Sequence, residues 1–276
     1  MIQQYIEYLT TIRGYSKNTA KAYGRDLKTF VNWAKANLPD ARWSAITRDD
    51  IDRYITWQVE QGKAPASTNR HLSAISGIFG YFKRQGYQID NPCKYESRRK
   101  LAKTIPNTIP IEDLRKAYLG TNGVAHYMIG ILATTGMRLQ ELLDLEWSSI
   151  DWETKAIKVE GKGRKQRITY TTTEVLEELR PLYDYAHGKG RIFCTDQRNA
   201  RYILWDALRQ YSSAKQLSPH AIRHTVATNM ANQGANVTTI ASLLGHSDIS
   251  TTQKYIDMTQ TGIQQACTQY SIIKNN

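Results

Sequence analysis

Cysteine is scarce in this 276-residue sequence, which contains three: Cys93, Cys194 and Cys267. The number is odd, the residues lie far apart, and their spacing matches no zinc site. A disulfide framework or a structural metal is therefore not expected. We predict three reduced thiols with no part in the chemistry.

Long apolar runs are also missing. No segment approaches the ~20 apolar residues that cross a membrane, and residues 1–5 do not begin a signal-peptide pattern. The sequence shows no internal repeat and no low-complexity tract. We therefore expect a cytoplasmic protein with no membrane partner. Its length predicts two domains, because it exceeds the usual size of a single core.

Acidic residues are fewer than basic ones. The chain has 25 Asp and Glu against 37 Lys and Arg, a formal net charge of +12 and a pI near 9.5. Residues 1–100 hold 17 of the basic residues but only 9 of the acidic ones. Such a surplus favours a polyanionic partner, because phosphates that bind cations release counterions. Nucleic acid is the natural candidate.

Apolar residues recur at helical spacing in four segments of the first hundred residues. Ser16 and Thr47 are the predicted N-caps of the second and third helices, and Pro65 is predicted to start the fourth. We expect a small four-helix bundle with these stripes as its core. The stripes comprise Ile2, Tyr5, Ile6, Leu9, Tyr23, Leu27, Phe30, Val31, Ile51, Tyr54, Ile55, Val59, Leu72, Ile75, Phe79 and Phe82.

Periodicity is lost over residues 97–110, where charge and proline accumulate as in a linker. We therefore predict a helical domain over residues 1–96, a linker over 97–110 and a second domain over 111–276. Helices resume at Ile111, and strands are predicted at residues 155–160 and 167–171 around a Gly-Lys-Gly turn. The predicted fold class is mainly α with a small β-hairpin or sheet.

Chemically active side chains gather at one predicted helix start in the second domain. Ser218 reads as the N-cap and Pro219 as the first helical residue. His220 and Arg223 then lie three residues apart on one helical face. They are close to an N-terminus whose free N–H groups favour a bound phosphate.

Two further groups follow along the chain. A short helix from 237 to 244 is predicted to end at Gly245, which presents His246 at the turn. Tyr255 comes nine residues later, on a further predicted helix. Singly, each residue would more often be structural, but four such groups in order beside helix ends indicate a site on a phosphodiester.

This ordered set, His220-x-x-Arg223, Leu-Gly-His246 and Tyr255, resembles the C-terminal signature of the tyrosine recombinase family, which includes phage integrases and Xer proteins. Residues 133–142 (ATTGMRLQEL) resemble its first arginine motif, and residues 159–167 (VEGKGRKQR) its lysine hairpin. The match covers most of residues 110–260. It implies a SAM-like core-binding domain of four helices and a mixed α/β catalytic domain.

The resemblance also implies a set of catalytic residues: Arg138, Lys162, His220, Arg223, His246 and Tyr255. Lys162 would act as general acid toward the departing 5′ oxygen, and His220 would help take the phenolic proton. His246 would hydrogen-bond the phosphate that is cleaved.

The residue types suit the transfer of a phosphoryl group between DNA strands. Arg138 and Arg223 can fork onto the non-bridging oxygens and stabilise the transition state in place of a metal ion. Tyr255 can become a covalent nucleophile. A phosphotyrosine ester preserves the energy of the broken bond, so rejoining needs no ATP, and no cofactor or metal is expected.

Alternatives remain open for some of these residues. Lys155, Lys158 and Lys165 compete with Lys162 for the role of acid. Glu141, one turn beyond Arg138, is predicted either to orient the site or to form a surface salt bridge. His224 lies about 100° round the helix from Arg223 and is predicted to support the structure.

The expected substrate is double-stranded DNA with inverted half-sites. Basic residues on the helices and in the linker are predicted to lie along its backbone. These residues are Lys17, Lys21, Arg25, Arg70, Lys83, Arg84, Arg98, Arg99 and Lys100. A basic tether between two domains suits a clamp around a duplex, and a protein with this substrate would be associated with the nucleoid.

The family exchanges strands among four DNA arms with four protomers, which implies a homo-tetramer. Residues 260–276 carry an apolar set that would be too exposed in a free tail. The tail is predicted to dock on a neighbouring subunit, and folding back on its own domain is the alternative. An accessory DNA-bending protein or a partner recombinase stays open.

Three functions compete. The first is a site-specific recombinase that works through a 3′-phosphotyrosine and a Holliday junction, either for integration and excision of a mobile element or for Xer-like resolution of dimers. The second is a type IB topoisomerase, which the short helical N-terminal domain disfavours. The third is a non-catalytic helical regulator, which the complete set of active groups disfavours. Because the helical domain begins almost at residue 1, we expect a simple architecture without a separate arm-binding domain in front.

Overall fold

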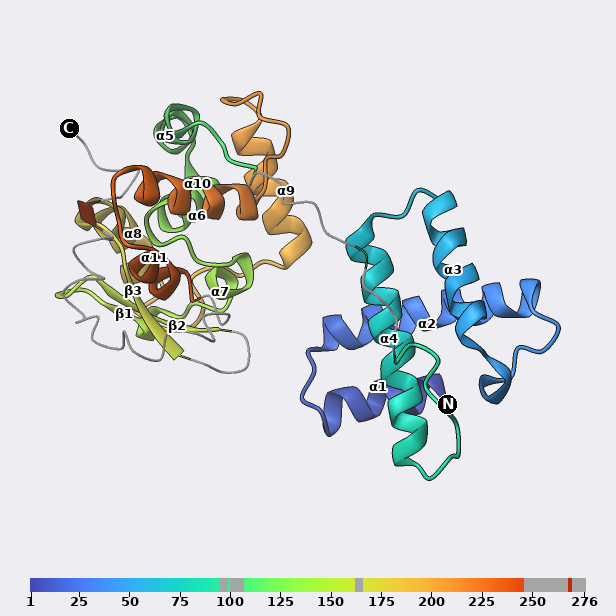
Figure 1. The fold of residues 1–276 in the computed structure, drawn as a ribbon. Helices are drawn as coiled ribbons and strands as arrows, with labels where there is room; N and C mark the ends of the chain where they lie inside the picture. The colour runs from blue at the N-terminus through green and yellow to red at the C-terminus, as the bar shows by residue number, and fades with distance from the viewer. Residues whose placement is uncertain (95–98, 100–106, 162–165, 246–267, 270–276) are drawn as a thin grey trace. The chain divides into compact units, whose positions relative to one another are not determined.

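The computed structural model describes residues 1–94, 99, 107–161, 166–245 and 268–269. The chain divides into two compact units, Met1–Thr104 and Ile105–Asn276. Figure 1 shows both, and each is described by itself. The predicted linker lies mostly outside the described residues, so its limits stay a prediction.

The described part of the first unit has four α-helices: α1 (Ile2–Thr11), α2 (Lys17–Asn37), α3 (Arg48–Glu60) and α4 (Pro65–Arg84). Both predicted caps are confirmed. Ser16 accepts a hydrogen bond from the backbone of Thr19, and Thr47 forms a reciprocal capping box with Asp50. The other three helices all contact α4, which runs through the bundle (Figure 1).

The core of the first unit contains the predicted stripes except Val31 and Val59, together with residues outside them such as Trp33 and Ile78. Phe30, Tyr54, Ile75 and Phe79 are almost fully buried. Val59 was predicted in the core, but 44% of it is exposed. The buried face of α3 passes through Gln58 instead, and the next residue lies about 100° further round the helix.

The described part of the second unit is a helical layer on a small sheet. Its helices are α5 (Ile111–Gly120), α6 (Gly123–Thr135), α7 (Leu139–Leu143), α8 (Thr173–Tyr185), α9 (Gln197–Leu208), α10 (Pro219–Asn232) and α11 (Val237–Leu244). Short 3-10 turns occur at Trp43–Ala45 in the first unit and Trp147–Ser149 in the second. No helix among the described residues is long and apolar enough to cross a membrane.

The sheet has three antiparallel strands in the order β1-β2-β3: β1 (Ile150–Asp151), β2 (Ala156–Glu160) and β3 (Gln166–Tyr170). Its β2–β3 hairpin was predicted, whereas β1 was missed because two residues give no alternating pattern. Val159 pairs with Arg167 across the hairpin. The mainly helical fold class with a small sheet is confirmed.

Helix α6 is the centre of the second unit. Every residue from Met128 to Thr135 is buried, so it reads as apolar on all sides. Helix α10 packs on α6, and α11 packs on α10 (Figure 1). The C-terminal ends of α6 and α11 meet α10 at Arg223, which bonds the carbonyls of Gly136 and Leu244.

Candidate active site

Arg138 is placed by the end of α6. Gly136 closes that helix in a left-handed conformation, with φ of 61°. A Cβ on Gly136 would come within 2.7 Å of the side chain of Leu244, so a larger residue would be strained and crowded there. Arg138 follows in extended backbone as the N-cap of α7.

Arg223 lies in the first turns of α10. Ser218 caps this helix by accepting a hydrogen bond from the backbone of Ala221, and Pro219 is its first residue, as predicted. The side chain of Arg223 is buried, with 6% of the residue exposed. Its guanidinium donates from Nη1 to the carbonyl of Gly136 at 2.8 Å and from Nη2 to the carbonyl of Leu244 at 2.5 Å.

Glu141 lies between two guanidiniums. Its carboxylate accepts hydrogen bonds from the backbone N–H of Arg138 at 2.7 Å and from Nη1 of the same residue at 2.8 Å. Arg167 adds two more, at 2.9 and 2.8 Å. Glu141 is 5% exposed. The alternative of a surface salt bridge is therefore wrong, because a surface carboxylate would not be enclosed in this way.

Arg167 is a site residue to which the motifs of the sequence assigned no role. It comes from β3 and is paired with the buried Val159, so it occupies the inward face of the hairpin. Side chains alternate between the two faces of a strand, so this alternation already marked the arginine at position 167 as inward-facing. Such a charge needs a buried partner, and Glu141 is that partner.

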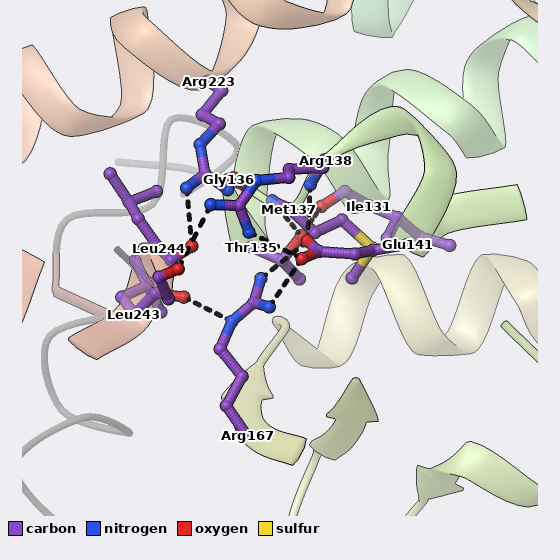
Figure 2. Close-up of polar contacts among 11 residues, drawn as sticks. Ile131, Thr135, Gly136, Met137, Arg138, Glu141, Arg167, Arg223, Leu243 and Leu244 are labelled. Carbon is purple, nitrogen blue, oxygen red and sulfur yellow. Dashed lines mark hydrogen bonds and ion pairs between the residues drawn. The ribbon is translucent and has the colours of Figure 1, made fainter. Parts of the chain in front are cut away.

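Three consecutive carbonyls at the end of α11 each accept a hydrogen bond from a different arginine (Figure 2). The carbonyl of Leu243 accepts from Arg167 Nε at 3.0 Å, and that of Gly245 accepts from Arg138 Nη2 at 3.1 Å. The carbonyl of Leu244 accepts from Arg223. A helix C-terminus has unpaired carbonyls and a negative dipole end, both of which suit cations.

The charges of the site perturb one another. Burial, and then the charge of Arg138, lower the pKa of Arg223 to about 10, although Glu141 acts in the opposite direction. Arg223 is still a cation at neutral pH. Burial alone would raise the pKa of Glu141, but the hydrogen bonds from Arg167 and Arg138 outweigh it, so this pKa lies below its usual range.

His220 stands on α10 one turn before Arg223 and is exposed at the surface of the unit. The protein around its ring, followed by the charge of Arg223, lowers its pKa below the usual value of 6.5. The imidazole is therefore neutral at pH 7 and can accept a proton. The neighbouring His224 is also exposed.

Three predicted catalytic residues lie outside the described residues: Lys162, His246 and Tyr255. Lys165 does too. Of the competing lysines, Lys158 is exposed on β2, and Lys155 has a positive φ of 60° at the start of the hairpin. The choice of Lys162 as the acid stays a prediction.

A polar cleft of about 720 Å³ opens beside the arginines. Arg138, Glu141, Lys158 and Gly161 are among the residues that line it, so it joins the first arginine motif to the base of the lysine hairpin. A phosphate bound to Arg138 would reach this cleft. Among the described residues, no group of three or more His, Cys, Asp or Glu could hold a metal ion.

The basic residues predicted to contact DNA belong to the first unit. Lys17, Lys21 and Arg25 are exposed on α2. Arg70 on α4 is exposed too, but its guanidinium donates to both oxygens of the buried Asp26, at 2.7 and 3.0 Å, so part of its charge is neutralised.

The remaining basic residues of this set differ in environment. Lys83 and Arg84 are exposed at the end of α4, and Arg84 lies over the ring of Tyr8. Arg99 is held by Asn69, which bonds its backbone N–H and carbonyl, each at 2.9 Å. Arg98 and Lys100 lie outside the described residues.

These elements define a phosphate-binding class of site: two guanidiniums, oriented by backbone carbonyls and by a buried carboxylate, stand beside a neutral histidine. Residues 113–261 match the Phage integrase family, and residues 2–86 match its N-terminal SAM-like domain. The chain therefore belongs to the phage integrase family and is a tyrosine recombinase.

Whole-length relatives agree with this assignment. The chain is 29% identical over 296 residues to Tyrosine recombinase XerD of Listeria innocua, with 98% of both chains covered. It is 30% identical over 292 residues to Tyrosine recombinase XerD of Pseudomonas putida, covering 98% of this chain and 96% of the relative. The protein is thus an enzyme of site-specific recombination, which breaks and rejoins DNA through a tyrosine.

Solved structures show the same fold. The XerH site-specific recombinase bound to difH substrate aligns with a TM-score of 0.70 at 18% identity, over 97% of this chain and 84% of that one. A lambda integrase tetramer bound to a Holliday junction aligns with a TM-score of 0.68 at 19% identity, over 92% of this chain and 78% of that one.

Proposed function

We propose that this protein is a Xer-like recombinase that cuts and rejoins DNA at short inverted half-sites, with Tyr255 as the nucleophile that forms the 3′-phosphotyrosine. The observation that carries the proposal is the meeting of Arg138 and Arg223 at the carbonyls of one turn, beside His220. The full-length relatives from Listeria innocua and Pseudomonas putida are both XerD recombinases, which favours the Xer-like form over integration of a mobile element.

The two arginines bind the phosphate and stabilise its transition state. A guanidinium carries five N–H donors. The described contacts of Arg138 and Arg223 use the terminal nitrogens of each, and every terminal nitrogen has a second N–H. Held by the protein on one side, the forks are oriented before DNA arrives, so little reorganisation is needed in the reaction.

Proton transfers complete the reaction. His220, neutral at pH 7, takes the proton of the Tyr255 phenol as its oxygen attacks phosphorus. Lys162 gives a proton to the departing 5′ oxygen, and His246 hydrogen-bonds the phosphate. Rejoining is the reverse transfer to a new 5′ hydroxyl, and the ester supplies its energy. We therefore propose a reaction without ATP or a metal ion.

The assembly follows from the substrate. Four DNA arms need four active sites, and a lambda integrase tetramer on a Holliday junction has the same fold as this chain. We propose a homo-tetramer on two synapsed sites, linked by residues 260–276, with a partner recombinase or a DNA-bending protein as additional components. We also propose that the protein acts on this DNA in the cytoplasm, with the nucleoid.

A nicked suicide substrate tests the nucleophile. A library of duplexes with randomised half-sites and a nick beside the central spacer would lose a short fragment after cleavage, which traps the covalent adduct. We expect wild type to form an adduct that survives denaturation, and sequencing of the trapped DNA to give inverted half-sites. Tyr255→Phe should bind the selected duplex with unchanged affinity and trap nothing.

Other outcomes point to the competing functions. Binding without any adduct in wild type would indicate a non-catalytic regulator. Relaxation of supercoiled plasmids regardless of sequence would indicate a topoisomerase. With the selected site cloned twice in direct repeat, resolution of the plasmid into two circles would support the Xer-like role.

A further inference from the structure

Arg167 differs from the other two arginines of the site in how its nitrogens are used. Each of them has a hydrogen bond to the protein: Nε to the carbonyl of Leu243, and Nη1 and Nη2 to the two oxygens of Glu141. Its side chain is 12% exposed, against 33% for Arg138. Arg167 therefore binds groups of the protein itself with all three of its nitrogens.

We propose that Arg167 is a positioning residue for DNA cleavage, which acts through Glu141 on Arg138 and through the carbonyl of Leu243 on the turn that leads to His246. This inference rests on the proposed roles of Arg138 and His246. It extends them to a residue that does not touch the substrate.

Through Glu141, Arg167 fixes the position of a buried carboxylate. The carboxylate has four hydrogen bonds, two from Arg138 and two from the fork of Arg167. Without Arg167, the carboxylate would keep only its bonds to Arg138 and would be free to pull that guanidinium inward. Arg167 therefore keeps Arg138 aimed at the phosphate, because it neutralises and fixes the far side of Glu141.

The link through α11 concerns the end of a helix. Arg167 Nε holds the carbonyl of Leu243, and the Arg167 side chain lies so close to Gly245 that a Cβ there would be 2.9 Å from Cδ. His246 is the next residue in the sequence. One side chain on β3 thus joins the lysine hairpin, the first arginine motif and the last turn of α11 (Figure 2).

Three variants test the proposal. Arg167→Gln removes the charge and the fork, whereas Arg167→Lys keeps the charge without the fork. Arg209→Gln is the matched control, because Arg209 is an exposed arginine of the same unit, 53% exposed and paired with Asp206. The substrate is the nicked duplex selected with wild type, and the measurement is adduct formation in a single turnover.

We expect Arg167→Gln to slow adduct formation about 100-fold at saturating DNA, because a displacement of about 1 Å in a catalytic group costs that much. The DNA concentration for half saturation should stay within about two-fold of wild type, because Arg167 does not contact DNA. Arg167→Lys should lose roughly 10-fold. Arg209→Gln should match wild type.

A second substrate separates positioning from general support of the fold. A methylphosphonate at the cleaved position lacks one negative charge, so it depends less on Arg138. If Arg167 acts through Arg138, the loss in Arg167→Gln should shrink to on the order of 10-fold on this substrate. Equal losses on both substrates, or cleavage at the wild-type rate, would overturn the proposal. Should Arg167→Gln fail to fold, the same comparison applies to Arg167→Lys.

Hydrogen exchange tests, without any cleavage, whether the bond from Arg167 to Leu243 stabilises α11. In free protein, Arg167→Gln should speed exchange in peptides covering α11 and leave those of α6 unchanged, and unchanged exchange in α11 would contradict the link through Leu243. If wild type forms no adduct, the proposed function fails, but hydrogen exchange still tests whether Arg167 stabilises the end of α11. If wild type forms adduct and Arg167→Gln equals it, the inference alone fails.

Discussion

Glu141 and Arg167 lie 26 residues apart in sequence, and both oxygens of the carboxylate accept hydrogen bonds from both terminal nitrogens of the guanidinium, at 2.9 and 2.8 Å. This two-pronged pair joins α7 to β3, and through Arg138 it reaches the proposed phosphate site. Because this buried carboxylate holds two arginines, the arrangement of the site depends on the negative charge of Glu141.

Glu141→Gln should lower the free energy of unfolding of the second unit by about 3 kcal/mol at pH 7, because it leaves two guanidiniums without their counter-charge. Urea denaturation of full-length protein measures this difference. Glu153→Gln, at an exposed position, is the control and should match wild type. A loss no larger than that of the control would show that the carboxylate charge is unimportant.

The same variant predicts a pH dependence. The pKa of Glu141 is lowered in the folded protein, so its stabilising contribution is complete above the usual carboxyl pKa of 4.5 and is lost as pH falls through the folded value. The stability difference between wild type and Glu141→Gln should therefore be constant from pH 7 down to the usual pKa and shrink below it. A difference that grows on acidification would contradict this assignment.

His220 gives a prediction for the rate of cleavage. Its pKa is lowered by the protein packed around the ring and by the charge of Arg223, so the neutral base is present at pH 7 and is lost as pH falls through a value below 6.5. Single-turnover adduct formation should decline on that acidic limb. His220→Asn should be slower and should lack the limb, whereas His224→Asn should keep it. A limb that persists in His220→Asn would assign it to another group.

Gly245, at the end of α11, can be tested against Gly234, which follows α10 and serves as a matched control. Both have positive φ, 63° and 84°, but a Cβ on Gly245 would come within 2.9 Å of Arg167, whereas one on Gly234 would have nothing within 4 Å. Gly234→Ala should cost roughly 1 kcal/mol from backbone strain alone. Gly245→Ala should cost more and should also slow cleavage. Equal costs with unchanged cleavage would refute a crowded, functional turn.

Lys21 tests the proposed DNA surface of the first unit. If it meets a phosphate, Lys21→Gln should lower the slope of log K against log salt concentration by about one, without changing sequence preference. Arg42→Gln is the control, because Arg42 pairs with Asp40 at 2.6 Å. Fluorescence anisotropy over a range of salt concentrations gives both slopes, and equal slopes for Lys21→Gln and wild type would remove this residue from the interface.

Local chemistry made much of the fold predictable. Ser16, Thr47 and Ser218 begin helices because their side chains replace a missing helical acceptor for an N–H group. Gly245 ends α11 because glycine tolerates the left-handed turn that a helix end needs. Strand β1 was missed because its two residues are defined by pairing with β2, a partner that no local pattern reveals.

The candidate site was predictable in part for the same reason. Order and spacing along the chain suggested Arg138, His220 and Arg223. The structure brings Arg138 and Arg223 to the end of α11 and places His220 one turn before Arg223 on α10. Arg167 belongs to the lysine-hairpin motif, but no role could be predicted for it, because its partners Glu141 and Leu243 are 26 and 76 residues away in the sequence.

By itself, the sequence determined where helices start and stop, which residue types are present for phosphoryl transfer, and how charge is divided between the two parts of the chain. These properties depend on neighbours within a few residues or on simple counting. Tertiary structure alone decided that Glu141 is enclosed by two arginines and that three arginines meet the carbonyls of α11. Such contacts join segments far apart in the chain, and burial then gives each hydrogen bond and charge its strength.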